Sequence, residues 1–195
     1  FENPTVATLA DALGERLPLP SALTIQPQPE NAPRVLSFAQ QKIWFMQQLM
    51  PDSSAYNLFS ALQMEGELNI AALQQAFNQL RARHAVLRTR FADEDGSPTL
   101  MPIAAQPVEH HDLRMLTAAE RQSRIEGLVD AAANRPFRLA EDALLRVSLL
   151  HCEERRYVLL LTLHHIIADG WSVGVMIDAL VQYYRQALSE RTVAL

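Results

Sequence analysis

The sequence predicts a mixed α/β fold, an α+β sandwich in which helices flank a mixed sheet. Its two most apolar segments are Leu144–Leu150 and Tyr157–Leu163, and the charged turn Glu153–Arg156 lies between them, so they should pair as a β-hairpin. Elsewhere, segments with helical periodicity alternate loosely with segments rich in strand-forming residues. Because some strands are joined as hairpins, the pattern favours a layered sheet with flanking helices over a purely parallel βαβ winding.

The first residues are predicted to be separate from the main domain. Residues 1–17 should form a short helix, which Thr5 can cap. The next stretch, 18–35, is rich in proline and poor in apolar side chains. Because proline excludes helix and removes backbone donors, this stretch is predicted to be a semi-extended linker. Residues 36–195 are then expected to form the main domain.

Capping signals mark the helices of the main domain. Ser37 and Gln40 form a capping box at the start of a helix that ends before Pro51. Asn69 can cap a second helix, and Thr117 with Glu120 can open a third. The second helix has an apolar face with helical spacing at Leu73, Ala76, Phe77 and Leu80. A last helix is predicted from about Ser172 to Leu188.

The remaining strands are predicted from alternating or β-branched runs. Asn57–Met64 alternates apolar and polar residues over most of its length. Val86–Phe91 and Thr99–Ile103 are expected to form strands joined around Asp95-Gly96, a favourable turn dipeptide. The adjacent pair His110 and His111 is interpreted as surface or strand-end residues.

The composition of the chain argues against several classes of protein. The chain has 195 residues, 49% of them hydrophobic, with a charged fraction of 20% and a net charge of -5, which is too apolar for disorder. The mild acidity argues against nucleic acid as a partner, because phosphate binding favours a basic face. No apolar run is long enough to cross a bilayer, and no signal peptide is recognisable. The single cysteine excludes an internal disulfide and fits a cytoplasmic location.

Two adjacent histidines carry the chemistry that the sequence offers. His164 and His165 end the second apolar strand, and Asp169-Gly170 follows before the last helix. Strand side chains alternate, so one imidazole can face the interior and the other a cleft. Histidine can orient or exchange a proton near neutral pH. Taken separately, His164 favours a structural role and Asp169-Gly170 a plain turn, while the His-His-x-x-x-Asp spacing is not a standard zinc pattern. The residues therefore leave His165 as a candidate acid–base group of undefined purpose.

Three motifs resemble a known family. The segment His164–Gly170 resembles the HHxxxDG signature of the chloramphenicol-acetyltransferase-like superfamily. Leu36–Trp44 resembles the motif SxAQxRLWxL, with Lys42 in the arginine slot and Ile43 for leucine. Arg83–Phe91 resembles RHExLRTxF, with Ala85 in place of glutamate. Together they resemble the N-terminal lobe of a non-ribosomal peptide synthetase condensation domain, which implies a lobe of the chloramphenicol-acetyltransferase type.

The resemblance implies a reaction and roles for individual residues. The reaction would be amide formation between a carrier-bound aminoacyl or peptidyl thioester and a carrier-bound aminoacyl acceptor. His165 would orient the attacking amine or accept its proton, and His164 would support the turn. Asp169 would be structural and ion-paired with an arginine, which would be either Arg88 or a residue of the C-terminal lobe. Gly170 permits positive φ or close approach of another backbone, and would let substrate pass. Trp171 and Ser172 extend the motif and are expected to line the substrate channel.

The resemblance also implies partners. Residues 1–10 resemble the last helix of a peptidyl carrier protein. Upstream and downstream carriers, the C-terminal lobe and a downstream adenylation domain are the expected partners, and the 195-residue chain alone is expected to be inactive. No metal or directly bound cofactor is expected, since phosphopantetheine is carried by the carriers. The alternatives are an epimerisation domain, another HHxxxDG acyltransferase, or a catalytically silent module that docks carriers. The run Gly170-Trp171-Ser172 favours condensation over epimerisation, and cyclisation domains have aspartates where this chain has its histidines.

Overall fold

The computed structural model describes residues 5–16, 35–94, 97–104 and 106–193. The chain divides into two units, Phe1–Pro33 and Arg34–Leu195. The first contains helix α1, Val6–Arg16, and the Thr5 hydroxyl accepts from the backbone N–H of Thr8 at 3.2 Å, so the predicted cap is confirmed. Residues 1–4, residue 17, the proline-rich linker up to residue 34, the turn residues 95–96, residue 105 and residues 194–195 lie outside the described part.

A four-stranded mixed sheet forms the centre of the second unit. Its strand order is β1-β6-β5-β4, with the bounds β1 Asn57–Glu65, β6 Arg156–His164, β5 Leu145–Glu153 and β4 Glu109–Asp112. The predicted hairpin of two apolar strands is β5–β6, and β1 also runs antiparallel to β6. The pair β4–β5 is parallel, which makes the sheet mixed, as predicted.

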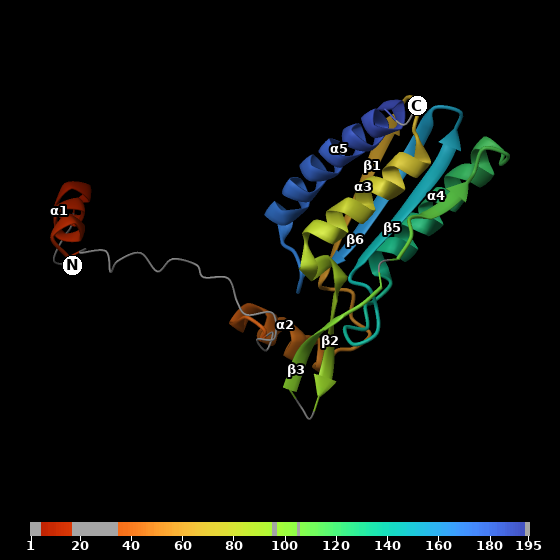
Figure 1. Ribbon diagram of the computed structural model, residues 1–195. Coiled ribbons are helices and arrows are strands. Elements are labelled where there is room, and N and C mark those ends of the chain that lie inside the picture. Colours follow the sequence, from red (N-terminus) through yellow and green to blue (C-terminus); the bar gives the residue numbers. More distant parts are fainter. Residues whose placement is uncertain (1–4, 17–34, 95–96, 105, 194–195) are drawn as a thin grey trace. The chain divides into compact units, whose positions relative to one another are not determined.

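Helices cover both faces of this sheet (Figure 1). Helices α3, Ile70–Arg83, and α5, Gly170–Val193, lie side by side on one face, and α4, Ala118–Asn134, lies on the other. The core beneath α3 and α5 includes Phe77, Leu80, Leu149, Leu161 and Leu163. The smaller core beneath α4 includes Leu113, Leu150, Cys152 and Leu160. The predicted layered α/β architecture with flanking helices is therefore confirmed.

The capping residues identified in the sequence begin the helices. Ser37 and Gln40 form a complete capping box at the start of α2, Phe38–Leu49. The Asn69 side chain accepts from the N–H of Ala72 in α3, and Thr117 forms a capping box in α4. Each of these side chains binds backbone donors that the first helical turn leaves free. Helix α5 starts two residues earlier and ends five residues later than the sequence predicts.

The predicted strand Val86–Phe91 is wrong in its first half. Ala85–Arg88 forms a 3₁₀ helix, η1, in which the N–H of Leu87 donates to the carbonyl of His84. Leu87 is buried in the core beneath α3 and α5. Its packing therefore outweighs the local strand propensity of this segment. Strand β2, Thr89–Glu94, then pairs antiparallel with β3, Ser97–Pro102, as a separate two-stranded sheet.

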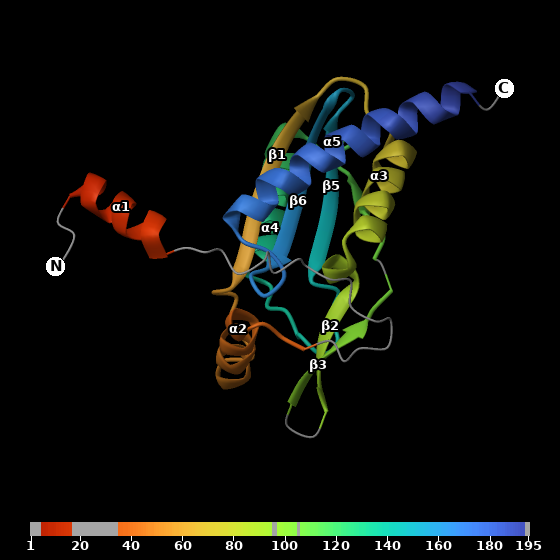
Figure 2. The same cartoon turned by 60° about the vertical axis from the view of Figure 1, so that its left-hand side comes forward.

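Strand β4 was not predicted from the sequence. It is four residues long and contains His110 and His111, which the sequence suggested only as surface or strand-end residues. Its strand character comes from parallel pairing with β5, a long-range contact that a short polar segment does not signal. Figure 2 shows α2 and the β2–β3 hairpin beyond the end of the sheet where β1 begins and β6 ends. The histidine motif lies at this same end.

Candidate active site

The two adjacent histidines have opposite environments. His164 is the last residue of β6 and its side chain is 1% exposed, whereas His165 is exposed. The backbone N–H of His165 donates to the carbonyl of Tyr56 at 2.8 Å, which extends the β1–β6 ladder by one residue. The predicted divergence of the two imidazoles is thus confirmed, and the alternation of side chains along a strand is its cause.

Hydrogen bonds define the protonation state of His164. The backbone N–H of Ile166 donates to its Nδ1 at 3.2 Å, so this nitrogen carries no proton. The Nε2 atom lies 3.3 Å from Oε1 of Gln47, and it therefore donates to that oxygen. Burial lowers the pKa of His164 from 6.5 to about 4, with smaller contributions from the His165 and Arg146 charges. His164 is a neutral, fixed ring at physiological pH.

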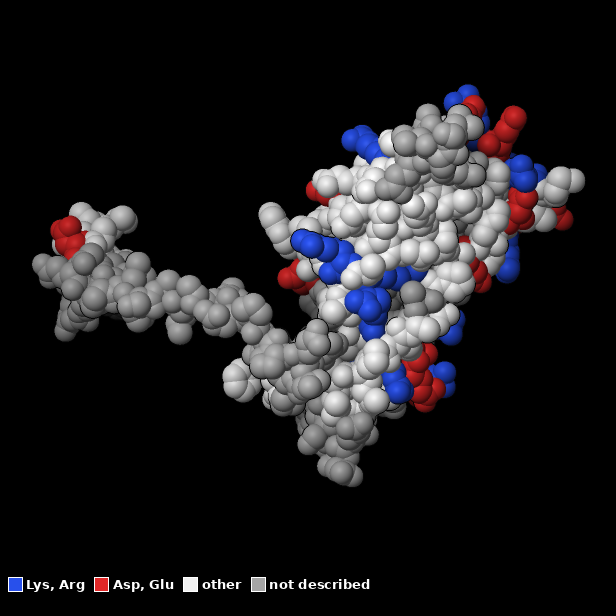
Figure 3. All heavy atoms as spheres, in the orientation of Figure 1, with Lys and Arg blue, Asp and Glu red and all other residues white. Residues whose placement is uncertain are grey.

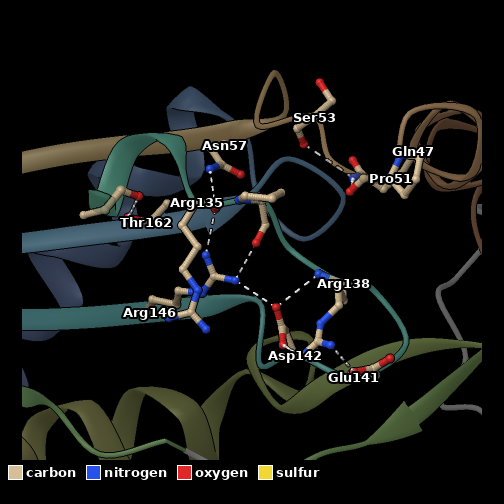
Figure 4. A network of polar contacts seen from close by, with 12 residues as sticks. Gln47, Pro51, Ser53, Asn57, Arg135, Arg138, Glu141, Asp142, Arg146 and Thr162 are labelled. Carbon is tan, nitrogen blue, oxygen red and sulfur yellow. Dashed lines mark hydrogen bonds and ion pairs between the residues drawn. The ribbon is translucent and has the colours of Figure 1, made fainter. Parts of the chain in front are cut away.

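Aromatic and cationic groups enclose the buried ring. The Phe137 ring meets His164 edge-on with a centroid distance of 5.9 Å, and Tyr56 lies at 6.0 Å. The guanidinium of Arg146 stacks on the Phe137 ring, 3.7 Å from its centroid. Figure 4 shows how Arg146 is held, by an ion pair to Asp142 at 2.8 Å and by hydrogen bonds to the carbonyls of residues 135 and 136. The Asp142 carboxylate therefore balances the positive charge of Arg146 close to the neutral His164 imidazole.

The Asp169 carboxylate caps helix α5. Its Oδ1 accepts from the backbone N–H of Ser172 at 2.8 Å and from the Ser172 hydroxyl at 2.5 Å. These bonds lower the pKa of Asp169, so the carboxylate is ionised at neutral pH. Arg88 instead donates to the carbonyls of Arg81 and Ala82, at 2.7 and 3.4 Å. Arg88 and Asp169 thus form no ion pair among the described residues, because a local cap satisfies Asp169 and the end of α3 binds Arg88. An arginine partner from the C-terminal lobe stays a prediction.

Gly170 and Trp171 begin the last helix. Gly170 is helical, and a Cβ at this position would meet none of the described atoms within 4 Å. Neither positive φ nor close packing against described residues requires glycine here, contrary to the sequence expectation. Trp171 is 83% exposed and borders, with Ser172, a mainly apolar pocket of about 240 Å³ between the end of α3 and the start of α5. The motif residues Ile167 and Ala168 also line this pocket.

Helix α2 supplies contacts that sequence reasoning did not assign. The Gln40 side chain donates to the carbonyl of Ile166 at 3.2 Å, and Gln47 contacts His164. Gln40 lies within the SxAQ motif, so the motif could have indicated it. Gln47 is 4% exposed. Nothing in the sequence indicated this burial, because glutamine is most often found on the surface. The turn 165–169 is thus fixed from both β1 and α2.

The wider surface adds little to the site. On the face in Figure 3, basic and acidic side chains are interspersed around a large uncharged area. Among the described residues, there is no helix long and apolar enough to cross a membrane. The described part of the chain also contains no group of three or more His, Cys, Asp and Glu side chains that could hold a metal ion.

Comparison with known sequences identifies relatives over most of the chain. The family model of the condensation domain matches residues 32–195. Chondramide synthase cmdD of Chondromyces crocatus is 39% identical over 154 residues, which cover 78% of this chain and 4% of that protein. Malpinin synthetase of Mortierella alpina is 34% identical over 188 residues, which cover 94% of this chain and 2% of that protein.

Solved structures resemble the chain as well. The starter condensation domain of rhizomide synthetase RzmA has a TM-score of 0.73 at 28% identity, over 82% of this chain and 40% of that one. The first condensation domain of the calcium-dependent antibiotic synthetase, in complex with a substrate analogue, has a TM-score of 0.72 at 26% identity, over 82% and 39%. The chain therefore spans 2–4% of the two curated relatives and about two fifths of these solved chains.

Proposed function

Because this chain belongs to the condensation-domain family, we propose that it takes part in peptide-bond formation in non-ribosomal peptide biosynthesis. The donor would be a carrier-bound aminoacyl or peptidyl thioester, and the acceptor a carrier-bound aminoacyl group. The observation that carries the proposal is the pair of histidines at the end of β6, one sealed and neutral and the other exposed. Only the exposed ring of His165 is accessible to substrate.

His165 is the proposed catalytic residue. A thioester is an activated acyl group, so the main requirement is to bring the amine to the carbonyl, which contributes up to about 7–11 kcal/mol in favourable cases. An imidazole can orient this amine by a hydrogen bond and accept its proton as the tetrahedral intermediate forms. The ladder bond from His165 N–H to Tyr56 fixes the backbone from which the ring projects.

The motif residues around His165 support it in different ways. Asp169 and Ser172 begin helix α5 and so set where the turn ends. Trp171 and Ser172 are proposed to line the substrate channel, which fits their place in the lining of the pocket beside the motif. Gly170 has open space around its Cα, which is consistent with substrate passing there.

The proposed partners follow from the reaction. Upstream and downstream peptidyl carriers would deliver the two substrates on phosphopantetheine arms, and a C-terminal lobe would form the other wall of the channel. An adenylation domain would load the downstream carrier. We also propose a cytoplasmic location, where the buried Cys152 thiol stays reduced.

The test is His165→Ala in the complete condensation domain with both carriers loaded. Loss of general acid–base assistance should lower the rate of dipeptidyl product formation by about 10²–10⁴, with the melting temperature unchanged. The matched control is His110→Ala, an exposed histidine on the edge strand β4, which should keep the wild-type rate. Wild-type turnover in His165→Ala would contradict the proposal, whereas dipeptidyl product from the isolated 195-residue chain would contradict only the expectation that this chain is inactive without a C-terminal lobe.

Product analysis also separates the rival functions. A condensation domain yields a new amide, whereas an epimerisation domain inverts the α-carbon of a single carrier-bound residue without elongating it. A silent docking module would bind loaded carriers and release neither product. Mass spectrometry combined with chiral analysis of the released products distinguishes the three outcomes.

A further inference from the structure

Gln47 uses both ends of its buried amide. The side chain lies near the end of α2 and is 4% exposed. Its Nε2 lies 3.0 Å from the carbonyl oxygen of Pro51, and 3.4 Å from those of Met50 and Ser53 (Figure 4). Its Oε1 lies 3.3 Å from Nε2 of His164. The amide therefore joins the loop between α2 and β1 to the histidine at the end of β6.

The three carbonyls determine which way the amide faces. Carbonyl oxygens only accept, so the NH₂ group of Gln47 must point to the loop and its oxygen to His164. An acceptor facing Nε2 requires His164 to carry its proton there. Nδ1 is then free to accept from the N–H of Ile166, the bond that closes the turn directly after His165. Donation thus runs without a break from the Ile166 N–H in the motif turn, through His164 and Gln47, to the carbonyls of the α2–β1 loop.

We propose that Gln47 is a positioning residue for the condensation reaction, acting through the His164 ring to hold the turn that presents His165. The proposal rests on the function proposed above. A His164 ring with a proton on Nδ1 would face the N–H of Ile166 with a second donor, and the bond would be lost. Because Ile166 follows His165 directly, the exposed ring would then lose a fixed position.

The charged and titratable groups around His164 are few among the described residues. Arg146 on β5 is ion-paired with Asp142, and His165 is adjacent in the chain. The phenol ring of Tyr56 lies at 6.0 Å, and Gln47 faces Nε2 from α2. Replacing Gln47 by glutamate would place a negative charge directly against the imidazole and favour a doubly protonated ring, and it would also remove the donor that binds the loop carbonyls.

The first experiment measures the pH dependence of kcat for Gln47→Glu in the complete condensation domain. A carboxylate beside the ring raises a histidine pKa by about one unit or more, so a doubly protonated His164 should form at a higher pH, and kcat should fall more steeply with acid than in the wild type while KM stays within about twofold. The control is Gln48→Glu, the same charge change on the exposed neighbouring residue of α2, which should leave the profile unchanged. A fall of kcat with acid that is the same in Gln47→Glu as in the wild type would overturn the proposal.

A second variant separates positioning from loop stability. Gln47→Met fills the same space without hydrogen bonds, so kcat should fall by roughly tenfold to a hundredfold at all pH values, with no shift of the acidic limb. A purely structural role predicts a lower melting temperature with wild-type kcat below the melting transition, and that result would contradict the proposal.

The third measurement does not depend on condensation. In protein with ¹⁵N-labelled histidine, two-bond ¹H–¹⁵N correlations should show wild-type His164 with an unprotonated Nδ1 and a protonated Nε2 at neutral pH. Gln47→Glu should show both nitrogens protonated at mildly acidic pH. The opposite tautomer in the wild type would overturn the proposed role of Gln47, whereas an active His165→Ala would overturn the function and leave this result standing.

Discussion

The buried His164 should make the stability of the domain depend on pH in a defined window. Folding lowers its pKa from 6.5 to about 4, which favours the neutral ring by about 3 kcal/mol at about 1.4 kcal/mol per pH unit. The unfolded chain binds the proton near pH 6.5, and the folded chain binds it only near pH 4. The contribution of His164 is therefore complete above pH 6.5 and is lost progressively as the pH falls to 4.

The assay compares urea unfolding of the wild-type condensation domain and of His164→Phe from about pH 7.5 down to about pH 4. Phenylalanine keeps an aromatic ring between Tyr56 and Phe137 but cannot titrate. It leaves the N–H of Ile166 without its acceptor, which lowers the stability of the variant by about 1–3 kcal/mol at every pH. The other acidic and basic groups titrate in both proteins, so they cancel in the difference between the two free energies of unfolding.

The expected difference curve has a distinctive shape. Above pH 6.5 it should be flat, and below this pH the advantage of the wild type should fall by about 1.4 kcal/mol per pH unit, to a total of about 3 kcal/mol near pH 4. Parallel stability curves for the two proteins across this window would refute the reasoning, because they would mean that His164 takes up its proton equally well in both states.

Further substitutions test the fold and the site. Phe77→Ala should lower the free energy of unfolding by about 3–5 kcal/mol, because its ring is fully buried beneath α3 and α5, and urea unfolding measures this. Thr117→Ala removes the capping box of α4 and should cost about 1 kcal/mol in the same assay, with no effect on product formation. Arg146→Met removes the half-buried partner of Asp142 and the cation on the Phe137 ring, and should cost about 1–3 kcal/mol and lower kcat. Asp169→Asn should lower the urea midpoint at neutral pH, and the deficit should shrink below about pH 4, because Ser172 lowers the pKa of the wild-type carboxyl and acid then protonates it.

The fold was predictable where its causes are local. The caps at Ser37, Asn69 and Thr117 bind donors within three residues, so they are visible in the sequence and agree with the structure. The hairpin of β5 and β6 was visible because both strands are apolar and adjacent. Strand β4 and the 3₁₀ helix η1 depend on contacts with β5 and with the core, and local composition does not encode such contacts.

The candidate site, too, was predictable only where its causes are local. The alternation of His164 and His165 follows from strand geometry alone, and the structure has one ring buried and one exposed, as expected. Arg88, one candidate partner of Asp169, binds the end of α3 instead, whereas Ser172 three residues after Asp169 satisfies the carboxylate as part of a helix cap. Gln47 could not be found, since 117 residues separate it from the histidine that it contacts.

The identity of the exposed histidine depends finally on the register of β1 and β6. His164 pairs with Asn57, and the Asn57 side chain donates to the carbonyls of Ala133 and Arg135 at the end of α4, at 2.8 and 3.0 Å. These are carbonyls that a helix end leaves free, so the bonds stabilise the helix end and fix β1 along its own axis. A slip of one residue would reverse which imidazole is sealed, because side chains alternate with a period of two. The end of α4, which is remote from the exposed ring in sequence, therefore helps to determine which of two identical neighbouring side chains can meet the substrate.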